Sequence, residues 1–156
     1  MAKFYLVGGV FNVAERSHNI YLEKYLTELG DEVVLPQREA LKHYNGRQFD
    51  TLAIMKDCVK FSTDPEYICV VCGDGARSDD GGSVEYGMTI NATGRAIFYR
   101  TDIRTAPRKE LGVNAMFKAG NTIYIFQPCI FTELGEIEAF YKKLAKKIHK
   151  AALQLL

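Results

Sequence analysis

Apolar residues follow two spacings along this chain, and the spacings alternate. Five short runs rich in β-branched and aromatic residues predict strands at 3–9, 32–35, 67–72, 95–99 and 122–126. Apolar positions three or four residues apart predict helices at 14–29, 49–61, 82–92 and 132–155. Residues 37–47 and most of 101–118 are predicted to be loops, with one turn near Asn114. This alternation predicts a three-layer α/β fold, a five-stranded parallel sheet flanked by helices.

Length and composition indicate a soluble globular protein. The 156 residues suit a single domain spanning 1–156, and 47% hydrophobic with 25% charged residues is ordinary. The formal charge of +1 suggests no nucleic-acid or membrane-surface partner, and the lysine-rich last helix is interpreted as a solvated face. The chain opens on a strand-like segment without the layout of a signal peptide, so we expect a cytoplasmic protein.

Cysteine and histidine spacing does not predict a metal site. Cys69 and Cys72 form a C-x-x-C, but within a predicted strand, where residues three apart point to opposite faces. Reduced, buried thiols are therefore expected. The three histidines, at 18, 43 and 149, show no ligand spacing.

An acidic, glycine-rich segment at 74–87 connects the predicted strand 67–72 to the helix 82–92. Ligands of parallel sheets bind at this kind of edge, beyond the carboxyl ends of the strands. Glu85 is placed in the first turn of its helix, where the dipole should stabilise its negative form, as a nucleophile or simply as a dipole partner. Asp79 and Asp80 are candidates for a proton donor, or for a helix cap and a solvated acid. Asp74, before a glycine, is expected to shape a turn.

Two further positions carry open alternatives. Asp50, early in helix 49–61, is either a residue that favours the helix dipole or an acid that binds a base. Phe11 lies in a glycine turn that lacks the spacings of dinucleotide folds and P-loops, and it could either stack on a base or pack against the protein.

Taken in order, several segments resemble the nucleoside 2-deoxyribosyltransferase family. They are the opening strand and loop (5–15), Leu-Pro-Gln-Arg at 35–38, the middle helix (49–58), Asp-Asp-Gly with Glu-Tyr-Gly at 79–87, and the later loops at 99–104 and 114–116. The likeness covers roughly residues 3–126. It implies a flavodoxin-like version of the predicted fold.

The resemblance implies catalytic roles for four residues. Glu85 would be the nucleophile that attacks C1′ of the deoxyribose, and Tyr5 would hydrogen-bond to Glu85 and hold it in place. Asp79 and Asp50 would contact the leaving base and manage its proton.

The resemblance also implies substrate contacts. Phe11 and Gln37 would line the base pocket, and Gly8 and Met116 belong to the matching loops around the substrate. Asn114 would reach the sugar in the site of a neighbouring subunit, which implies a homo-oligomer.

The implied reaction moves 2-deoxyribose between purine or pyrimidine bases by double displacement, following the logic of retaining glycosidases. Its substrates would be deoxynucleosides and free nucleobases, and it requires no cofactor. One alternative is a hydrolase of deoxynucleosides or nucleoside 5′-monophosphates. The first glycine loop has no serine or arginine that could bind a phosphate, so a hydrolase of nucleoside 5′-monophosphates ranks below the transferase. A non-catalytic nucleotide-binding domain is disfavoured because Glu85, Asp79 and Asp50 are all present.

Overall fold

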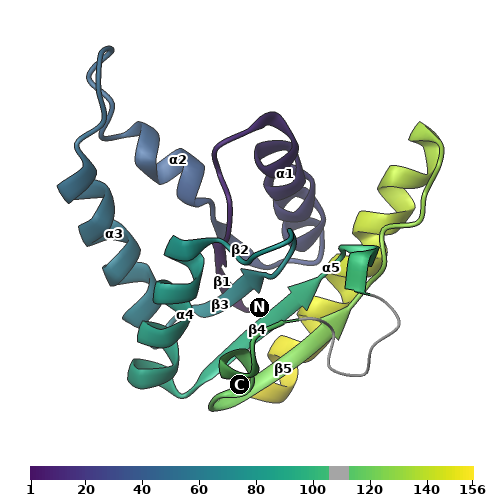
Figure 1. The fold of residues 1–156 in the computed structure, drawn as a ribbon. Coiled ribbons are helices and arrows are strands. Elements are labelled where there is room, and N and C mark those ends of the chain that lie inside the picture. Colours follow the sequence, from purple (N-terminus) through teal and green to yellow (C-terminus); the bar gives the residue numbers. More distant parts are fainter. Residues whose placement is uncertain (106–112) are drawn as a thin grey trace.

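The computed structural model describes residues 1–105 and 113–156, and within them it contains a five-stranded parallel sheet (Figure 1). The strands are β1 (Lys3–Val7), β2 (Glu32–Val34), β3 (Ile68–Cys72), β4 (Arg95–Arg100) and β5 (Asn121–Phe126). Their order is β2-β1-β3-β4-β5, and every neighbouring pair is parallel. The predicted α/β fold is thus confirmed, and the strand order is that of flavodoxin-like sheets.

Helices cover both faces of the sheet. They are α1 (Val13–Glu28), α2 (Pro36–Leu41), α3 (Thr51–Thr63), α4 (Asp80–Thr93) and α5 (Leu134–Leu155). Helices α1 and α5 lie together on one face, and α3 and α4 lie on the other (Figure 1). Helices α1, α3 and α4 lie in connections between parallel strands, whereas α5 follows the last strand.

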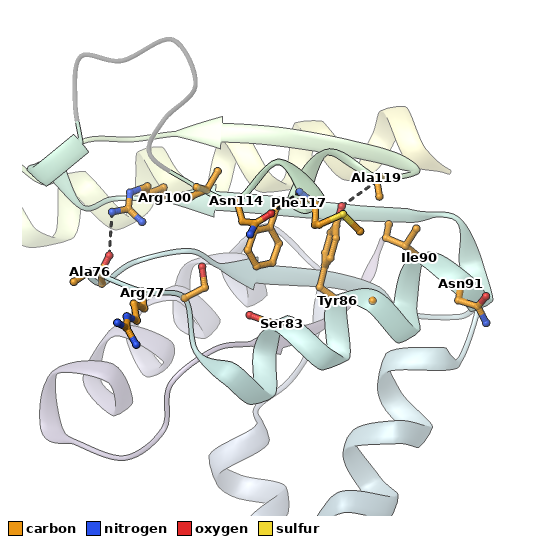
Figure 2. Close-up of a pocket in the computed structure, with 15 residues that line it drawn as sticks. Ala76, Arg77, Ser83, Tyr86, Ile90, Asn91, Arg100, Asn114, Phe117 and Ala119 are labelled. Carbon is orange, nitrogen blue, oxygen red and sulfur yellow. Dashed lines mark hydrogen bonds between the residues drawn. The ribbon is translucent and has the colours of Figure 1, made fainter.

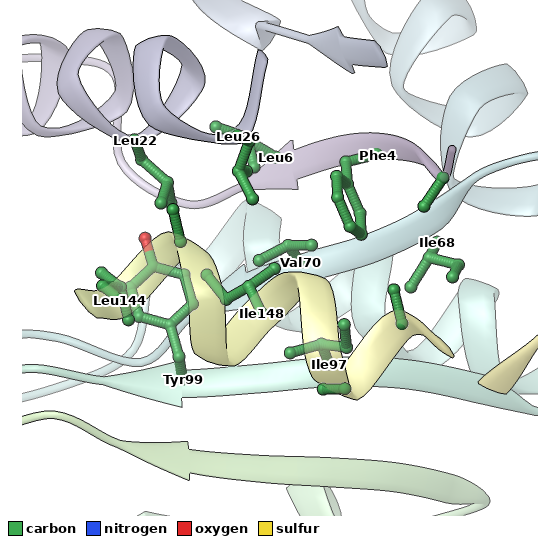
Figure 3. Close-up of a cluster of buried hydrophobic side chains, with 14 of the residues drawn as sticks. Phe4, Leu6, Leu22, Leu26, Ile68, Val70, Ile97, Tyr99, Leu144 and Ile148 are labelled. Carbon is green, nitrogen blue, oxygen red and sulfur yellow. The ribbon is translucent and has the colours of Figure 1, made fainter. Parts of the chain in front are cut away.

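The sheet is buried on both sides because apolar residues continue without interruption along the central strands. On the α1 and α5 face, Phe4 and Leu6 of β1 pack with Leu22 and Leu26 of α1 and with apolar residues of α5 (Figure 3). On the other face lies a second cluster of alternate strand residues with residues of α4 and of the segment before β5, namely Tyr5, Val7, Cys69, Val71, Tyr86, Ala96, Phe98 and Phe117. The alternation of strand side chains assigns each residue to one cluster.

The C-x-x-C follows the same rule. Cys69 packs in the cluster under α3 and α4, whereas Cys72 packs against the cluster under α1 and α5. All four cysteines of the chain are free. The prediction that this pair points to opposite faces is confirmed.

The segment after β2 corrects the prediction of a loop at 37–47. Residues Pro36–Leu41 form the short helix α2, which begins at a proline. Proline has its φ fixed near the helical value, so it suits a first helical turn. Gln37 then holds α2 against α1, because its Nε2 donates to the carbonyl of Arg16 (3.0 Å) and its Oε1 accepts from Asn19 (2.9 Å). These tertiary contacts favour a helix where the polar local sequence gives no helical spacing.

The predicted turn near Asn114 is present. Two short 3₁₀ helices are found, η1 (Ile103–Thr105) and η2 (Ala115–Lys118), and Asn114 caps η2 by accepting from the N–H of Met116 at 3.0 Å. The rest of the predicted loop, 106–112, lies outside the described residues.

Candidate active site

The glycine-rich segment after β3 is tied to the end of β4. The carboxylate of Asp74 accepts from the backbone N–H groups of Thr101 (2.6 Å) and Asp102 (2.9 Å) and from the Thr101 hydroxyl. In return, the carboxylate of Asp102 accepts from the N–H of Gly75 at 3.1 Å. Asp74 therefore does more than shape a local turn, because it joins two loops at the carboxyl edge of the sheet.

Helix α4 begins in this fixed segment. Asp79 is its N-cap, and Oδ2 accepts from the N–H of Gly82 at 2.7 Å. Gly82 is buried against Val7 of β1, where a Cβ would lie 3.3 Å from a Val7 methyl group. The capping interpretation of Asp79 is thus confirmed, and Asp80 is the exposed acid in the first turn. The glycine lets α4 start close to β1.

Glu85 lies in the second turn of α4, half-buried, and faces β1 and α3. Burial raises the pKa of its carboxyl from 4.5 to about 7, and the charge of Asp79 adds to the increase. Hydrogen bonding to the Tyr5 phenol and the Cys58 thiol lowers the pKa and only partly offsets burial. The prediction that Glu85 lies in the first turn, where the helix dipole stabilises its negative form, is wrong, because the side chain lies in the second turn and loses water.

The carboxylate of Glu85 is incompletely satisfied. Its Oε2 atom is buried and has no hydrogen-bond partner among the described residues. Leaving a buried carboxylate oxygen unpaired costs stability, so such a group marks a place where something other than folding determines the residue.

Tyr5 presents a neutral phenol to this carboxylate. Its ring is buried in β1 and stacks on Phe61 of α3, with ring centroids 5.4 Å apart. Burial, together with the charge of Glu85, raises the pKa of Tyr5 far above its usual range, so the hydroxyl stays protonated and can donate. Tyr5 is therefore close enough to Glu85 for the two groups to shift each other's pKa.

Cys58 of α3 completes the surroundings of Glu85, a role that the sequence did not indicate. Burial raises the pKa of its thiol, and Glu85 and Asp57 raise it further, so the thiol is neutral. Apart from the apolar spacing of the middle helix, nothing in the sequence indicated this contact.

Four of the other predicted residues are divided among three cavities, and Glu85 lines none of the three. A cavity of about 560 Å³ between α2 and α3 contains Asp50. One of about 600 Å³ beside α1 contains Asp79. The largest, about 650 Å³, contains Asn114 and Met116.

The largest cavity lies on the other side of α4 from α3. Tyr86 of α4 packs against Phe117 of η2, with ring centroids 5.0 Å apart, and Ile90, Asn114 and Ser83 line the same cavity (Figure 2). Met116 is 71% exposed. Within one chain, therefore, Asn114 and Met116 do not meet Glu85.

Two residues expected at the base pocket have different surroundings. Phe11 is 81% exposed, so it is not packed against the protein. Gln37 is buried, with its amide bound to α1 as described above. Gly8 has φ of +152° and its Cβ would lie 3.0 Å from the Cβ of Cys72, so it permits close packing of two strand ends.

Asp50 caps α3 and accepts from the N–H of Ala53 at 3.0 Å. The carbonyl of His43 in turn accepts from the N–H of Asp50 at 2.9 Å, and the His43 ring is paired with Asp57 at 2.7 Å. These contacts place Asp50 at the exposed start of α3, on the same side of the sheet as Glu85.

In the part of the chain that the structure describes, no group of three or more His, Cys, Asp or Glu side chains could hold a metal ion. Nor is any described helix long and apolar enough to cross a membrane.

The fold has counterparts among known structures. No family model matches the sequence, and no curated protein matches it. A conserved protein from Enterococcus faecalis V583 superposes with a TM-score of 0.67 at 18% identity, over 96% of this chain and 98% of that one. A 2-deoxyribosyltransferase from Bacillus psychrosaccharolyticus superposes with a TM-score of 0.58 at 21% identity, over 88% of this chain and 90% of that one. This chain has the fold of a 2-deoxyribosyltransferase. At these identities the similarity shows the shared fold alone.

Proposed function

We propose that this protein transfers 2-deoxyribose between nucleobases through a covalent deoxyribosyl-Glu85 intermediate. The observation that carries the proposal is the Glu85 carboxylate itself. It is half-buried near the start of α4, with one oxygen unpaired among the described residues, and Tyr5 and Cys58 hold it. A carboxylate kept from water and incompletely bonded suits attack on a carbon that develops positive charge.

The reaction has two steps. In the first, an oxygen of ionised Glu85 forms a bond to C1′ as the bond from C1′ to the base nitrogen breaks. The base leaves with that electron pair and takes a proton from an acid, Asp79 or Asp50. In the second step, a nitrogen of another base attacks C1′ and gives its proton to the carboxylate that protonated the first base, and Glu85 leaves as a carboxylate. Two inversions restore the original anomer.

Tyr5 acts by positioning. Its protonated phenol lowers the pKa of Glu85 and so favours the ionised form that attacks. Without it, burial and the charge of Asp79 would leave Glu85 protonated over more of the neutral range.

The proposal extends to assembly. Asn114 and the exposed Met116 lie across α4 from Glu85, so they would serve the site of a neighbouring copy of the chain. Phe11, Gln37 and Gly8 would border the base and sugar in the same chain.

The test is incubation of the protein with deoxyinosine and free adenine, followed by chromatography. Deoxyadenosine is the product expected of a transferase, whereas hypoxanthine without a new nucleoside would indicate a hydrolase. Glu85→Gln should lose about 10³-fold or more in rate. Glu66→Gln, an exposed acid at the opposite edge of the sheet, serves as the control. Full activity in Glu85→Gln would show that the assigned nucleophile is wrong.

A further inference from the structure

Glu15 is a carboxylate that the proposed reaction does not use. It lies in the first turn of α1, half-buried, and lines the cavity of about 600 Å³ at the carboxyl ends of β1, β3 and β4. The same cavity is lined by Asp79, whose charge raises the pKa of Glu85. The cavity therefore adjoins the proposed site along the edge of the sheet.

The backbone around Glu15 is built to hold its carboxylate. Oε2 accepts from the N–H groups of Phe11 (2.8 Å) and Asn12 (3.3 Å). The side chain of Asn12 accepts from the N–H groups of Ala14 (3.0 Å) and Glu15 (3.1 Å). This reciprocal capping box uses four backbone donors at the start of α1.

Gly9 leaves room for the same carboxylate. A Cβ at this position would lie 2.6 Å from Oε1 of Glu15, well inside contact distance. The loop packs closely around the Glu15 side chain. Backbone N–H groups that could otherwise bind an anionic ligand donate to Glu15 instead.

The charged side chains that line the cavity also disfavour an anionic ligand. Four carboxylates, of Glu15, Asp74, Asp79 and Asp102, line it with two guanidiniums, of Arg77 and Arg104. The guanidinium of Arg104 is bound to Asp102, at 2.8 Å for Nε, and that of Arg100 lies 3.8 Å from the same carboxylate, which leaves the carboxylates in excess by one. A phosphate here would meet uncompensated negative charge in partly desolvated surroundings.

We propose that Glu15 is a specificity-determining residue that restricts the site to nucleosides with a free 5′-hydroxyl and excludes their 5′-phosphates. The inference rests on the proposed function in one respect, the placement of C1′ at Glu85. A nucleoside held there lies over the carboxyl edge of the sheet, and a phosphate on its sugar that projects along this edge approaches Glu15.

The decisive measurement is kcat/KM for deoxyinosine and for deoxyinosine 5′-monophosphate, with adenine as acceptor. Glutamine also forms capping boxes, so Glu15→Gln removes the charge and keeps an acceptor for the Phe11 N–H. The ratio of kcat/KM for the monophosphate to kcat/KM for the nucleoside should rise about tenfold or more in Glu15→Gln, because a negative charge is removed from beside the phosphate. Glu28→Gln removes the same charge from the far end of α1 and should leave the ratio as in the wild type.

A ratio that stays within about twofold of the wild type in Glu15→Gln overturns the inference, as does a wild type that uses both donors equally well. Should Glu15→Gln fail to fold, Glu15→Ala is measured in the same way.

A binding measurement separates this inference from the proposed function. If no protein turns over either donor, the proposed function fails. Calorimetric titration with deoxyinosine 5′-monophosphate then tests Glu15 alone, and binding to Glu15→Gln should be about tenfold tighter than to the wild type. Equal affinities, or no detectable binding by either protein, overturn the role of Glu15.

Discussion

The carboxylate of Asp74 accepts a 2.6 Å hydrogen bond from the backbone N–H of Thr101, which joins the segment after β3 to the end of β4. The same carboxylate accepts from Asp102, so one side chain satisfies donors from two consecutive residues. The guanidinium of Arg100 adds to this connection by donating to the carbonyls of Gly73 and Gly75. The glycine-rich segment that leads to Glu85 is therefore fixed from the neighbouring strand.

We expect Asp74→Ala to destabilise the protein by about 2–3 kcal/mol, because partly buried donors of Thr101 and Asp102 lose their acceptor. Urea unfolding at neutral pH measures this. Asp80→Ala, an exposed acid of the same segment, should cost about 1 kcal/mol or less. Equal losses in the two variants would show that the link between the loops contributes nothing.

Tyr5→Phe should change the pH dependence of catalysis. Hydrogen bonding to Tyr5 lowers the pKa of Glu85, which is about 7, and the proposed reaction needs ionised Glu85. In the wild type kcat/KM should therefore rise as pH increases through about 7. In Tyr5→Phe the same rise should occur at higher pH.

The pH profile is compared with that of Tyr21→Phe, a half-exposed tyrosine that stacks on Tyr141 of α5. Its profile should match the wild type. An unshifted profile in Tyr5→Phe would show that Tyr5 does not act on Glu85.

The fold could be predicted because the information is local. Continuous apolar runs identify the central strands, and in β1 the alternation of Phe4, Tyr5, Leu6 and Val7 between two clusters follows from strand geometry. The short helix α2 could not be predicted, since it depends on contacts of Gln37 with a helix that begins more than twenty positions earlier.

The candidate site was only partly predictable, for a related reason. The sequence places Glu85 in an acidic, glycine-rich segment, but its ionisation depends on burial beside Tyr5 and Cys58, which come from other elements. The dipole argument from helix position therefore gave the wrong direction for the pKa. Glu15 had a local signal, an Asn three residues before a Glu, which is the pattern of a capping box.

A half-buried histidine connects three elements and should make stability sensitive to acid. The His18 ring of α1 is hydrogen-bonded to Tyr99 of β4 (Nε2, 2.7 Å) and to Tyr141 of α5 (Nδ1, 2.9 Å). Burial lowers the pKa of His18 below 6.5, although the charge of Asp74 opposes this. Below pH 6.5 the unfolded chain binds a proton at His18 before the folded protein does, so this residue lowers stability as pH falls.

His18→Gln removes that contribution. Between pH 7 and 5 the free energy of unfolding should fall in both proteins. The fall should be about 1 kcal/mol smaller in the variant than in the wild type. At pH 8 it should be less stable than the wild type, because an amide cannot match both bonds to Tyr99 and Tyr141. Denaturant unfolding across this pH range measures both effects. Parallel pH curves for the two proteins would contradict the assignment.

Ionised Glu85 should lower the free energy of unfolding at neutral and higher pH. Its pKa is 4.5 in an unfolded chain and about 7 in the folded protein. Below pH 4.5 both states are protonated and the residue is neutral in each. Between these values the unfolded chain releases its proton first, so stability falls as pH rises. Above pH 7 the penalty levels off at up to about 3 kcal/mol.

Glu85→Gln resembles the protonated side chain and cannot ionise, so it should be more stable than the wild type at pH 8 and about equally stable at pH 4. The gain in stability would accompany the loss of the proposed transferase activity, as expected when a residue is kept for chemistry rather than for folding. Urea unfolding at the two pH values measures the difference, with Glu66→Gln as an exposed control that should show little change. A Glu85→Gln variant that is less stable than the wild type at pH 8 would mean that the ionised carboxylate stabilises the fold, and the argument for Glu85 as nucleophile would lose its physical basis.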